Sequence, residues 1–533
     1  MTAAIAERGT YVIDEMRARW GWVNDCAVRD GHAYSVKAPA TSLLGVPFYA
    51  AYHRLTEATD LEYERTAALW ICRVFASILP WLVFLWFFHR WLGRHTSSPL
   101  VRDAVFVSLA LGSCLYGYGM LFMSHTLSAA AAMGAFMLLY DARHAGRTTT
   151  LRAFGAGLLA AGVSLLEYPG FVASAALSLY ALIALRPWIR VVSFGLGALI
   201  PTLTMMHFQW KCFGSPFSPG HLYVESDFFR ERHEEGFFGA VGWQWDAVYG
   251  LLVHPGAGLF PLTPILAFAA VGFGVLLWRR YARVDALVAL VVFFGTLAGI
   301  AVMNNWRGGW TVGPRYLVLV YPFLAWATLR GLEPLVRRAP KVAASIAVGA
   351  TAAGLVLSGV PSAYYPHYPI EVDRPVTQVV SVLIDHGYAP YTFANLLGVY
   401  GGWSMVPLGG LAVAALAWVV LAHRDRLGRA VAALGGALVA TAICVPLLID
   451  PRPGHPEVRD AVALITRTWK PAGHDAAARL AARLDADAPP SSYRRLAALY
   501  EAEGRDREAR RARARADAIE RRAALDQSSS DTP

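Results

Sequence analysis

The chain has 533 residues, of which 56% are hydrophobic and only 16% are charged, and its mean hydropathy is +0.39. This composition excludes a soluble globular protein of this size and predicts a polytopic membrane protein. The formal net charge is +10. Most of the cations lie in short loops between apolar runs or in the C-terminal tail, so membrane orientation explains the charge and nucleic-acid binding is not expected. Five cysteines without metal-ligand spacing exclude a disulfide framework and a zinc ribbon.

The first segment, residues 1–66, is polar and precedes the first long apolar run. It contains Asp25, Asp30 and Lys37, followed by a short apolar run at 38–52. A helix needs about 18 apolar residues to cross a bilayer, and this run is shorter. We therefore expect an interfacial helix at the extracytoplasmic surface, with a first span encoded upstream of Met1. In the alternative, the run crosses the membrane and leaves the acids in the cytoplasm.

Twelve longer apolar runs follow, and they predict an all-α transmembrane domain at 67–449. They lie at 67–88, 104–122, 127–140, 154–166, 171–185, 191–208, 259–278, 286–303, 316–329, 342–360, 405–422 and 430–449. Several of them are short and are joined by links of only a few residues. Their boundaries are therefore the least certain part of this prediction.

Alternate loops between these runs differ in their content of Lys and Arg. One set holds 18 cations and the other holds six, although the loops of the second set are much longer. Cytoplasmic loops retain cations, so the first set is predicted to be cytoplasmic. The first segment, the loops at 211–258, 304–315 and 361–403, and everything after Asp450 are then extracytoplasmic.

Residues 450–533 form a separate tail rich in Ala, Arg, Asp and Glu. Its apolar residues have the spacing of one tetratricopeptide-like helical hairpin: Tyr493, Leu496, Ala497, Tyr500, Ala509 and Ala516. Such arrays usually need about three repeats to bury a shared core. A charged amphipathic tail, disordered in part, is therefore the alternative.

Four sequence stretches suggest a family. They are DGHAYSVKAP before an apolar run, SHTLSAAAA at the start of a span, FGSPFSPG with GLFPLTPIL, and WRGGWTVGPRYLVLVYPFL. In this order and loop placement the chain resembles the GT-C superfamily of membrane glycosyltransferases, specifically the bacterial relatives of protein mannosyltransferases and aminoarabinose transferases. The resemblance implies an all-helical membrane enzyme that takes sugar from a polyprenyl-phosphate carrier and works on the extracytoplasmic side.

Three cations are candidates for binding the donor phosphate, which gains negative charge as the sugar departs. Lys37 directly precedes Ala38-Pro39, and in the resembled enzymes a lysine before a proline pair contacts that phosphate. Arg307 and Arg315 flank a Gly-Gly turn on the side where cations are rare. The alternatives are a snorkelling interfacial lysine, and arginines that contact lipid headgroups or cap the following span.

Transfer to a hydroxyl needs a general base, for which Asp25 and Asp30 are the candidates. The alternative is that both are solvated loop acids. The resemblance places its usual acidic motif directly after the first span, upstream of Met1, and places His125 where a second acid is expected. His125 is read as a base, a metal ligand or a histidine at a helix end, and Glu167 as an acid held at the membrane edge or a residue that completes a helix.

The loop after 211 offers oxygen and nitrogen ligands for a divalent metal ion, a cofactor that several GT-C enzymes use, but their spacing fits no defined site. These residues are His221, Glu225, Asp227, His233, Glu234 and Glu235. The metal therefore stays open, and a mobile polar loop is the alternative.

The functional prediction is a glycosyltransferase in the cell membrane that moves a sugar from a polyprenyl-phosphate donor to an extracytoplasmic acceptor. The acceptor, whether glycan, lipid or protein, cannot be read from the sequence. The alternatives are a transporter or flippase for lipid-linked sugars, and a catalytically inactive membrane scaffold whose tail recruits partners. Polar residues cluster in loops on one side and no internal repeat is visible, which disfavours transport.

Overall fold

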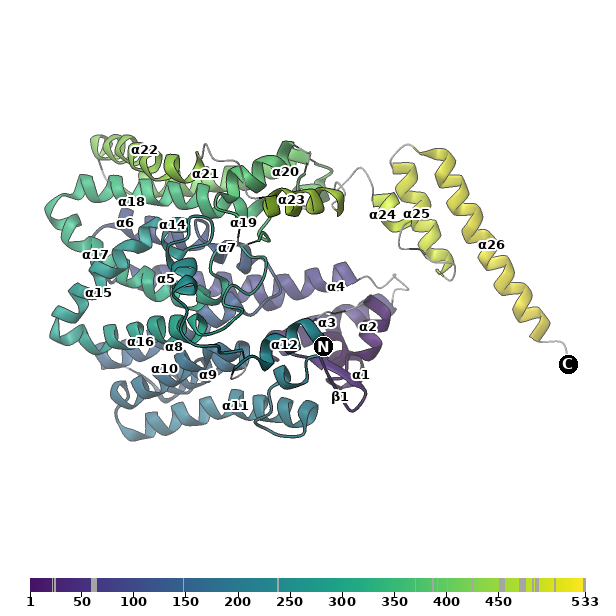
Figure 1. The fold of residues 1–533 in the computed structure, drawn as a ribbon, viewed down its shortest axis with the longest axis horizontal. Helices are drawn as coiled ribbons and strands as arrows, with labels where there is room; N and C mark the ends of the chain where they lie inside the picture. The colour runs from purple at the N-terminus through teal and green to yellow at the C-terminus, as the bar shows by residue number, and fades with distance from the viewer. Residues whose placement is uncertain are drawn as a thin grey trace.

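Figure 1 shows the computed structural model, in which long helices run side by side. The structure describes residues 1–530 except 22, 24, 59–64, 147, 237–238, 370, 386–387, 391, 400, 424, 450–455, 469–475, 482–483, 485–487 and 503–504. Helices dominate these residues, and the sheet they contain is a two-stranded hairpin. The predicted all-α membrane fold is confirmed.

The first segment folds into short helices around this hairpin. Its elements are α1 (Thr2–Arg8), α2 (Asp14–Trp20), β1 (Cys26–Arg29), β2 (His32–Ser35) and α3 (Ala40–Ala58). The strands are antiparallel, and Arg29 lies opposite His32. The turn between them holds Asp30 at φ 52° and Gly31 at φ 80°, a left-handed conformation that Asp and Gly tolerate better than most residues. The helix α3 covers the short apolar run and packs on α1.

Helices occupy all twelve predicted apolar runs. In chain order they are α4 (Arg65–Cys72), η1 (Arg73–Ile78) and α5 (Leu79–Leu92); α6 (Pro99–Ala110) and α7 (Cys114–Gly119); α8 (His125–Ala145); α9 (Thr150–Leu166); η2 (Tyr168–Gly170) and α10 (Phe171–Ala184); α11 (Trp188–Phe213); α14 (Leu259–Leu262), η4 (Pro264–Ala267) and α15 (Phe268–Trp278); η5 (Arg280–Ala282) and α16 (Arg283–Ala301); η6 (Arg315–Val320) and α17 (Tyr321–Arg338); α18 (Pro340–Gly354), η7 (Leu355–Gly359) and α19 (Val360–Tyr364); η10 (Gly401–Met405) and α21 (Val406–Leu421); and α22 (Arg426–Leu448).

Six helical segments of the described chain are long and apolar enough to cross a membrane by themselves. They are Ala67–Leu92, Trp188–Phe213, Arg280–Ala301, Pro340–Tyr364, Gly401–Leu421 and Arg426–Leu448. Shorter apolar helices at Thr150–Leu166, Tyr168–Ala184 and Pro264–Trp278 pack among them. The chain is therefore a multi-pass membrane protein.

The run at 104–122 is divided, because α6 ends at Ala110 and α7 begins at Cys114. Ser113 lies at the break, where its hydroxyl donates to Leu109 O at 2.6 Å and accepts from Leu115 N at 3.2 Å. Because the serine hydroxyl bonds a carbonyl group at the end of α6 and an N–H group at the start of α7, the backbone can change direction inside an apolar environment.

Glycines allow close backbone contact between helices. A Cβ atom on Gly157 of α9 would lie 1.9 Å from Phe194 O of α11, and one on Gly197 of α11 would lie 2.0 Å from Phe154 O of α9. The same holds between α15 and α17, where a Cβ on Gly272 would lie 1.8 Å from Ala327 O. Small residues at helix contacts are the usual means by which membrane helices approach one another.

The bundle has two chemically different ends. At one, which we name the basic end, Arg94 pairs with Asp141, Arg143 donates to Tyr281 O, and Arg330 donates to the Tyr281 hydroxyl. These contacts join loops that were all predicted to be cytoplasmic.

At the other, which we name the loop end, lie the β-hairpin and the longer connections. The helical elements in these connections are η3 (Gly220–Tyr223), α12 (Asp227–Glu234), α13 (Trp245–Leu252), η8 (Val376–Val380), α20 (Ser381–Asp385) and η9 (Phe393–Leu397). Glu225 N donates to Cys26 O at 2.9 Å, and Thr311 N donates to Tyr368 O at 3.0 Å. Segments predicted to share one side of the membrane therefore lie against one another.

The tail contains α23 (Pro456–Thr468), α24 (Ala476–Ala481), α25 (Pro490–Ala502) and α26 (Asp506–Ser530). The helices α24 to α26 lie apart from the bundle in Figure 1. Leu496 and Ala497 of α25 pack with Ala512 of α26 in a small apolar cluster. Residues 503–504, which connect these two helices, lie outside the described residues.

Candidate functional site

Two helix ends at the loop end place a histidine beside a glutamate. The helix α8 begins at His125, directly after Ser124, and α9 ends directly before Glu167. His125 Nδ1 lies in close contact with Glu167 Oε1, and Ser124 Oγ donates to the same oxygen at 3.0 Å. The two paired side chains are only 9% and 13% exposed. A carboxylate at this depth needs such partners, because an unpaired buried charge is strongly destabilising.

The Glu167 carboxylate is held in its ionised form. Burial by itself would raise the pKa of Glu167, but the attraction and hydrogen bond of His125, the Ser124 hydroxyl and the charge of Arg315 outweigh it. The pKa of Glu167 therefore lies below its usual value. His125 thus turns its Nδ1 edge toward a fixed negative charge. Its second ring nitrogen, Nε2, lies on the other edge of the ring.

The loop that follows α16 is glycine-rich and carries the two predicted arginines. Gly308 and Gly309 have φ angles of 76° and 85°, a conformation that glycine adopts without strain. A Cβ atom on Gly308 would lie 2.6 Å from Arg315 Nε and 2.7 Å from Tyr316 Cε2. Gly308 is therefore required for the Arg315 guanidinium to pack against the loop backbone.

Arg307 and Arg315 are half-buried and keep hydrogen-bond donors that could bind an anion. Arg307 Nη2 donates to Pro369 O at 3.4 Å, and Arg315 Nη2 donates to the Tyr316 hydroxyl at 3.3 Å. The Nε–H group of each is buried and has no hydrogen-bond acceptor among the described residues. Since a guanidinium carries five N–H donors in a planar fork, these two long bonds leave donors for a phosphate or carboxylate.

The two arginines differ in their electrostatic surroundings. Burial lowers the pKa of Arg307. Burial also acts to lower the pKa of Arg315, but the Tyr316 and Tyr118 hydroxyls and Glu167 outweigh it, so the pKa of Arg315 is raised. Arginine stays protonated in either case. The cost of burying the positive charge is thus offset less at Arg307 than at Arg315. Arg315 is the cation that interacts with Glu167.

The short helix α7 connects this polar group with an apolar cavity. The Tyr118 ring meets the His125 ring edge-on, with centroids 5.0 Å apart, and the Tyr118 hydroxyl is hydrogen-bonded to the Thr311 hydroxyl. Two residues earlier, Tyr116 lines the cavity. One turn of helix therefore presents tyrosines to two different environments.

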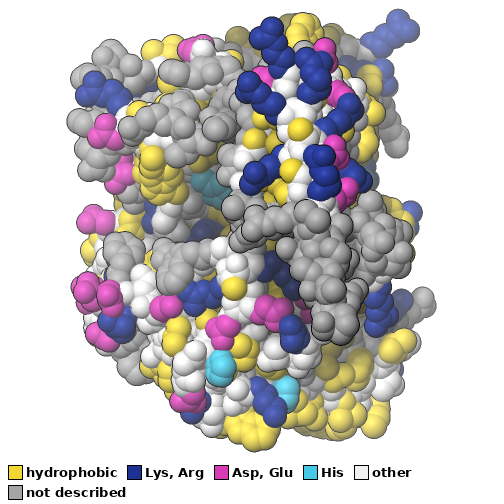
Figure 2. Space-filling model, turned by 90° about the vertical axis from the view of Figure 1, so that its right-hand side faces the viewer, with side chains coloured by type: hydrophobic (Ala, Val, Ile, Leu, Met, Phe, Trp, Pro, Cys, Tyr) yellow, Lys and Arg dark blue, Asp and Glu magenta, His cyan; other side chains and the backbone are white. Residues whose placement is uncertain are grey.

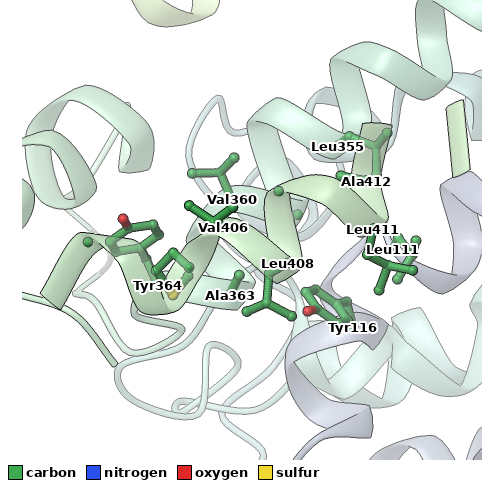
Figure 3. Close-up of a pocket in the computed structure, with 14 residues that line it drawn as sticks. Leu111, Tyr116, Leu355, Val360, Ala363, Tyr364, Val406, Leu408, Leu411 and Ala412 are labelled. Atoms are coloured by element: carbon green, nitrogen blue, oxygen red, sulfur yellow. The ribbon is translucent and has the colours of Figure 1, made fainter. Parts of the chain in front are cut away.

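The cavity has a volume of about 350 Å³ and lies between α6, α7, η7, α19 and α21 (Figure 3). Its lining is apolar apart from two tyrosines: Leu111, Tyr116, Leu355, Gly359, Val360, Ala363, Tyr364, Gly402, Met405, Val406, Leu408, Gly409, Leu411 and Ala412. No charged side chain lines it. The cavity is therefore suited to a hydrocarbon chain, and the polar chemistry belongs to the neighbouring group.

The structure places Asp25, Asp30 and Lys37 on the surface hairpin. Lys37 Nζ lies 2.5 Å from Asp25 Oδ2, and both side chains are partly exposed. Asp30 is 82% exposed and pairs with its neighbour Arg29 at 3.3 Å. Among the described residues no ion pair joins these three to Arg307 or Arg315. The structure thus brings Lys37 to Asp25 and leaves Asp30 in solvent.

The hairpin and the buried His125–Glu167 pair nevertheless border the same segment. Glu225 N, just after η3, donates to Cys26 O of the hairpin at 2.9 Å. The ring of His221 within η3 meets the ring of Tyr168 edge-on, with centroids 5.4 Å apart. Tyr168 directly follows Glu167. One connection therefore contacts both groups of predicted residues.

Figure 2 shows this end of the molecule, with acidic, basic and histidine side chains among hydrophobic ones. The face is hollowed near its middle, and basic side chains are visible below the surrounding surface. Such mixed surfaces are expected where polar connections meet a membrane.

The predicted metal ligands do not converge. No group of three or more His, Cys, Asp or Glu side chains among the described residues suits a metal ion. Glu225 pairs with Arg17, and Asp227 pairs with Arg230. The side chain of His233 lies outside the described residues. A divalent cation does not fit the residues described in this loop.

The loop end and its bundle can be compared with known structures. The chain is similar to ArnT. The structure of ArnT from Cupriavidus metallidurans in the apo state has 18% sequence identity and a TM-score of 0.45, covering 90% of this chain and 75% of ArnT. The structure of the same protein bound to undecaprenyl phosphate has 16% identity and a TM-score of 0.46, covering 90% and 76%. No protein-family model matches the chain, and no curated protein matches it.

The pairing of His125 with Glu167 is the feature that sequence reasoning missed. Each residue is singled out by its place at the end of an apolar helix, but only as an isolated side chain. Because α8 and α9 are consecutive and joined by a short connection, the start of one and the end of the other must lie at the same end of the bundle. That rule would have placed the two residues at the same end of the bundle.

Proposed function

We propose that the protein is a glycosyltransferase that moves a sugar from a polyprenyl-phosphate donor to an acceptor at the loop end. The observation that carries the proposal is the pair of half-buried arginines whose Nε–H groups lack acceptors among the described residues. They lie in the same part of the fold as a buried, ionised Glu167 and an apolar cavity. This combination supports recognition of an anionic group attached to a long apolar chain.

The arginines match the charge change of the reaction. When the bond between the sugar and the phosphate breaks, the departing polyprenyl phosphate gains a negative charge. Fixed cations in a site with little water stabilise such a charge more than water does. Arg307 and Arg315 would bind the phosphate through their guanidinium forks, and the Gly308 backbone would keep Arg315 in place.

The apolar cavity supports the choice of a lipid-linked donor. It is adjacent to α7, whose Tyr118 contacts His125 and Thr311. An isoprenoid chain in this cavity would contact only carbon-rich side chains and two tyrosines (Figure 3). Burial of such a chain contributes roughly 25 cal/mol for each Å² of apolar surface removed from water.

The residues of the surface hairpin keep their predicted roles in this proposal. Lys37 remains a proposed phosphate ligand, and Asp25 and Asp30 remain proposed bases, as the sequence predicts. Because Lys37 is paired with Asp25, a donor phosphate would have to replace that carboxylate as its partner. The excess of Lys and Arg in the loops of the opposite end supports an extracytoplasmic position for the loop end, where the acceptor would be met.

The test uses purified protein, radiolabelled polyprenyl-phosphate sugars and a membrane extract, followed by analysis of where the label goes. Wild-type protein should move label from the donor to an extract component. Arg315→Gln should lower the rate about 100-fold to 1,000-fold, the effect typical of removing one donor to a developing oxyanion, and Arg307→Gln should act similarly. Lys37→Ala should abolish transfer while the protein remains in the membrane; unchanged turnover would remove Lys37 from the site.

The matched control is Arg230→Gln, because Arg230 lies on α12 at the loop end and pairs locally with Asp227. It should leave transfer unchanged. Wild-type protein that transfers no label from any donor would contradict the proposed function. Movement of intact donor across vesicle bilayers without transfer would favour the transporter instead.

A further inference from the structure

We propose that His125 accepts the proton of the acceptor group, that Glu167 positions it, and that the acceptor is therefore an uncharged hydroxyl. This inference rests on the proposed function and names the acceptor class that the sequence leaves open. It starts from the close contact between His125 Nδ1 and Glu167 Oε1 and from the position of both residues at the loop end.

The orientation of the imidazole is fixed on several sides. Glu167 Oε1 faces Nδ1, and Ser124 Oγ donates to that same oxygen. The Tyr118 ring packs edge-on against the imidazole, and the Tyr316 ring lies on a further side with centroids 6.5 Å apart. A carboxylate close to Nδ1 favours the tautomer that carries its proton on Nδ1 and leaves Nε2 as the proton acceptor.

One anion lies among the groups around His125. The groups that face it are Glu167 from the end of α9, Tyr118 from α7 and Tyr316 from η6, while Arg315 acts on Glu167. Glu167 is the single anion of this set. It stabilises the imidazolium that forms when His125 takes a proton, as a buried carboxylate does beside a catalytic histidine.

The step balances in atoms and charge. The acceptor oxygen forms a bond to the anomeric carbon, and the bond from that carbon to the phosphate oxygen breaks with its electron pair leaving on the phosphate. The hydroxyl proton passes to His125 Nε2 and then to water. The polyprenyl phosphate departs with one more negative charge, which Arg307 and Arg315 face.

An anionic acceptor is disfavoured by the same arrangement. A phosphate monoester is largely dianionic above its second pKa of about 6, so it has no proton for His125 to remove. It would also approach the Glu167 carboxylate, and like charges repel at this depth. A sugar, lipid or side-chain hydroxyl meets neither obstacle.

The kinetic test compares His125→Gln and Glu167→Gln with wild-type protein across a pH series, using labelled polyprenyl-phosphate sugar and membrane extract. Wild-type transfer should fall at acid pH, where imidazole is already protonated. His125→Gln should lose about 100-fold to 10,000-fold in rate, should lose that acid limb, and should still bind undecaprenyl phosphate in a thermal-shift assay. Added imidazole should restore part of the activity of His125→Ala, which leaves space for the ring.

The pH profile of Glu167→Gln tests whether Glu167 positions His125. Without the carboxylate the imidazolium is less stable, so the acid limb should move to lower pH and the plateau rate should fall. A purely structural role would lower the rate and leave the limb in place. The double variant His125→Gln with Glu167→Gln leaves no unpaired charge and substitutes for the single variant if that one does not fold. The control His207→Gln, an exposed histidine near Tyr11, should behave as wild type.

The product identifies the acceptor class. A label attached through a hydroxyl resists mild acid, whereas a glycosyl phosphate releases its sugar. Acid-labile product, or His125→Gln with wild-type rate and pH profile, would overturn this inference and leave the proposed function standing. Wild-type protein without any transfer would instead remove the proposed function.

Discussion

The basic end and the loop end of the bundle both bury a carboxylate, but they surround it differently. At the basic end Asp285 is fully buried and accepts hydrogen bonds from Arg143 Nη1 and His144 Nε2 at 2.8 Å each and from the Tyr180 hydroxyl at 2.5 Å. Arg143 also donates to Tyr281 O at 3.1 Å. Three helices, α8, α10 and α16, are joined at one saturated acid.

At the loop end some polar groups keep hydrogen-bond donors that have no acceptor among the described residues. Glu167 is paired with His125 and Ser124, but the neighbouring arginines keep buried Nε–H groups without acceptors among the described residues. Buried polar groups are normally satisfied in proteins, and those that are not require a reason. At the basic end the buried carboxylate is saturated by three donors, whereas at the loop end two cations keep buried Nε–H donors that a ligand could occupy.

The two ends also differ in the charges that surround a buried histidine. At the basic end His95 accepts a hydrogen bond from Trp326 Nε1 at 3.4 Å. Burial, then the charges of Arg330 and Arg94, lower the pKa of His95 to about 3. This histidine is kept neutral, whereas His125 at the loop end faces a carboxylate.

The largest expected effect that separates the ends comes from Asp285→Ala. It leaves the Arg143 charge without its buried partner, and breaking such a pair costs about 3–5 kcal/mol. Thermal unfolding in detergent should show a marked loss of stability, while binding of undecaprenyl phosphate by the folded fraction should persist. A wild-type melting temperature would show that the saturated acid does not hold the basic end together.

The next effect is a pH dependence of stability that arises from His95. Its pKa in the folded protein lies below the unfolded value of 6.5, so between about pH 3 and 6.5 the unfolded chain binds more protons. Stability from this group is full above 6.5 and declines as pH falls, by up to about 1.4 kcal/mol per pH unit. His95→Gln, which can still accept from Trp326, should show a flatter decline, measured by melting at pH 7.5 and 5.5.

Gly308→Ala should affect the loop end alone. A left-handed backbone costs a non-glycine residue about 1–2 kcal/mol, and the new methyl group would meet Arg315. Affinity for undecaprenyl phosphate should fall more than the melting temperature. Gly309→Ala is the matched control, because it has a similar φ of 85° but its Cβ would meet nothing within 4 Å. Equal losses in both variants would show that backbone strain, not Arg315, is responsible.

The smallest effect is expected for Arg94→Ala at the basic end. Arg94 forms a two-oxygen ion pair with Asp141 at 2.9 Å, but its side chain is 62% exposed. Exposed pairs contribute at most about 1 kcal/mol. Melting and transfer should both stay near wild type, and a loss comparable with that of Asp285→Ala would mean that exposure does not distinguish the pairs.

The sequence by itself determined the class of the protein and the presence of its apolar helices. The spans follow from apolar runs, because a backbone in lipid must satisfy its hydrogen bonds within each helix. The alternation of Lys and Arg between loops predicted which segments share an end, and Cys26 with Glu225 and Thr311 with Tyr368 are placed together as expected. These properties are local or follow from counting crossings, so they can be read along the chain.

The tertiary structure alone decided which side chains meet. Lys37 and Asp25 were predicted for separate roles and pair with each other, while His125 and Glu167, read singly, form one buried pair. Pairing depends on the rotation and depth of each helix, which close contacts such as that of Gly157 with Phe194 fix. When a helix is apolar on all sides, the hydropathy of its sequence does not show which face points toward a neighbouring helix. The partners of a polar side chain are therefore known only from the packed structure.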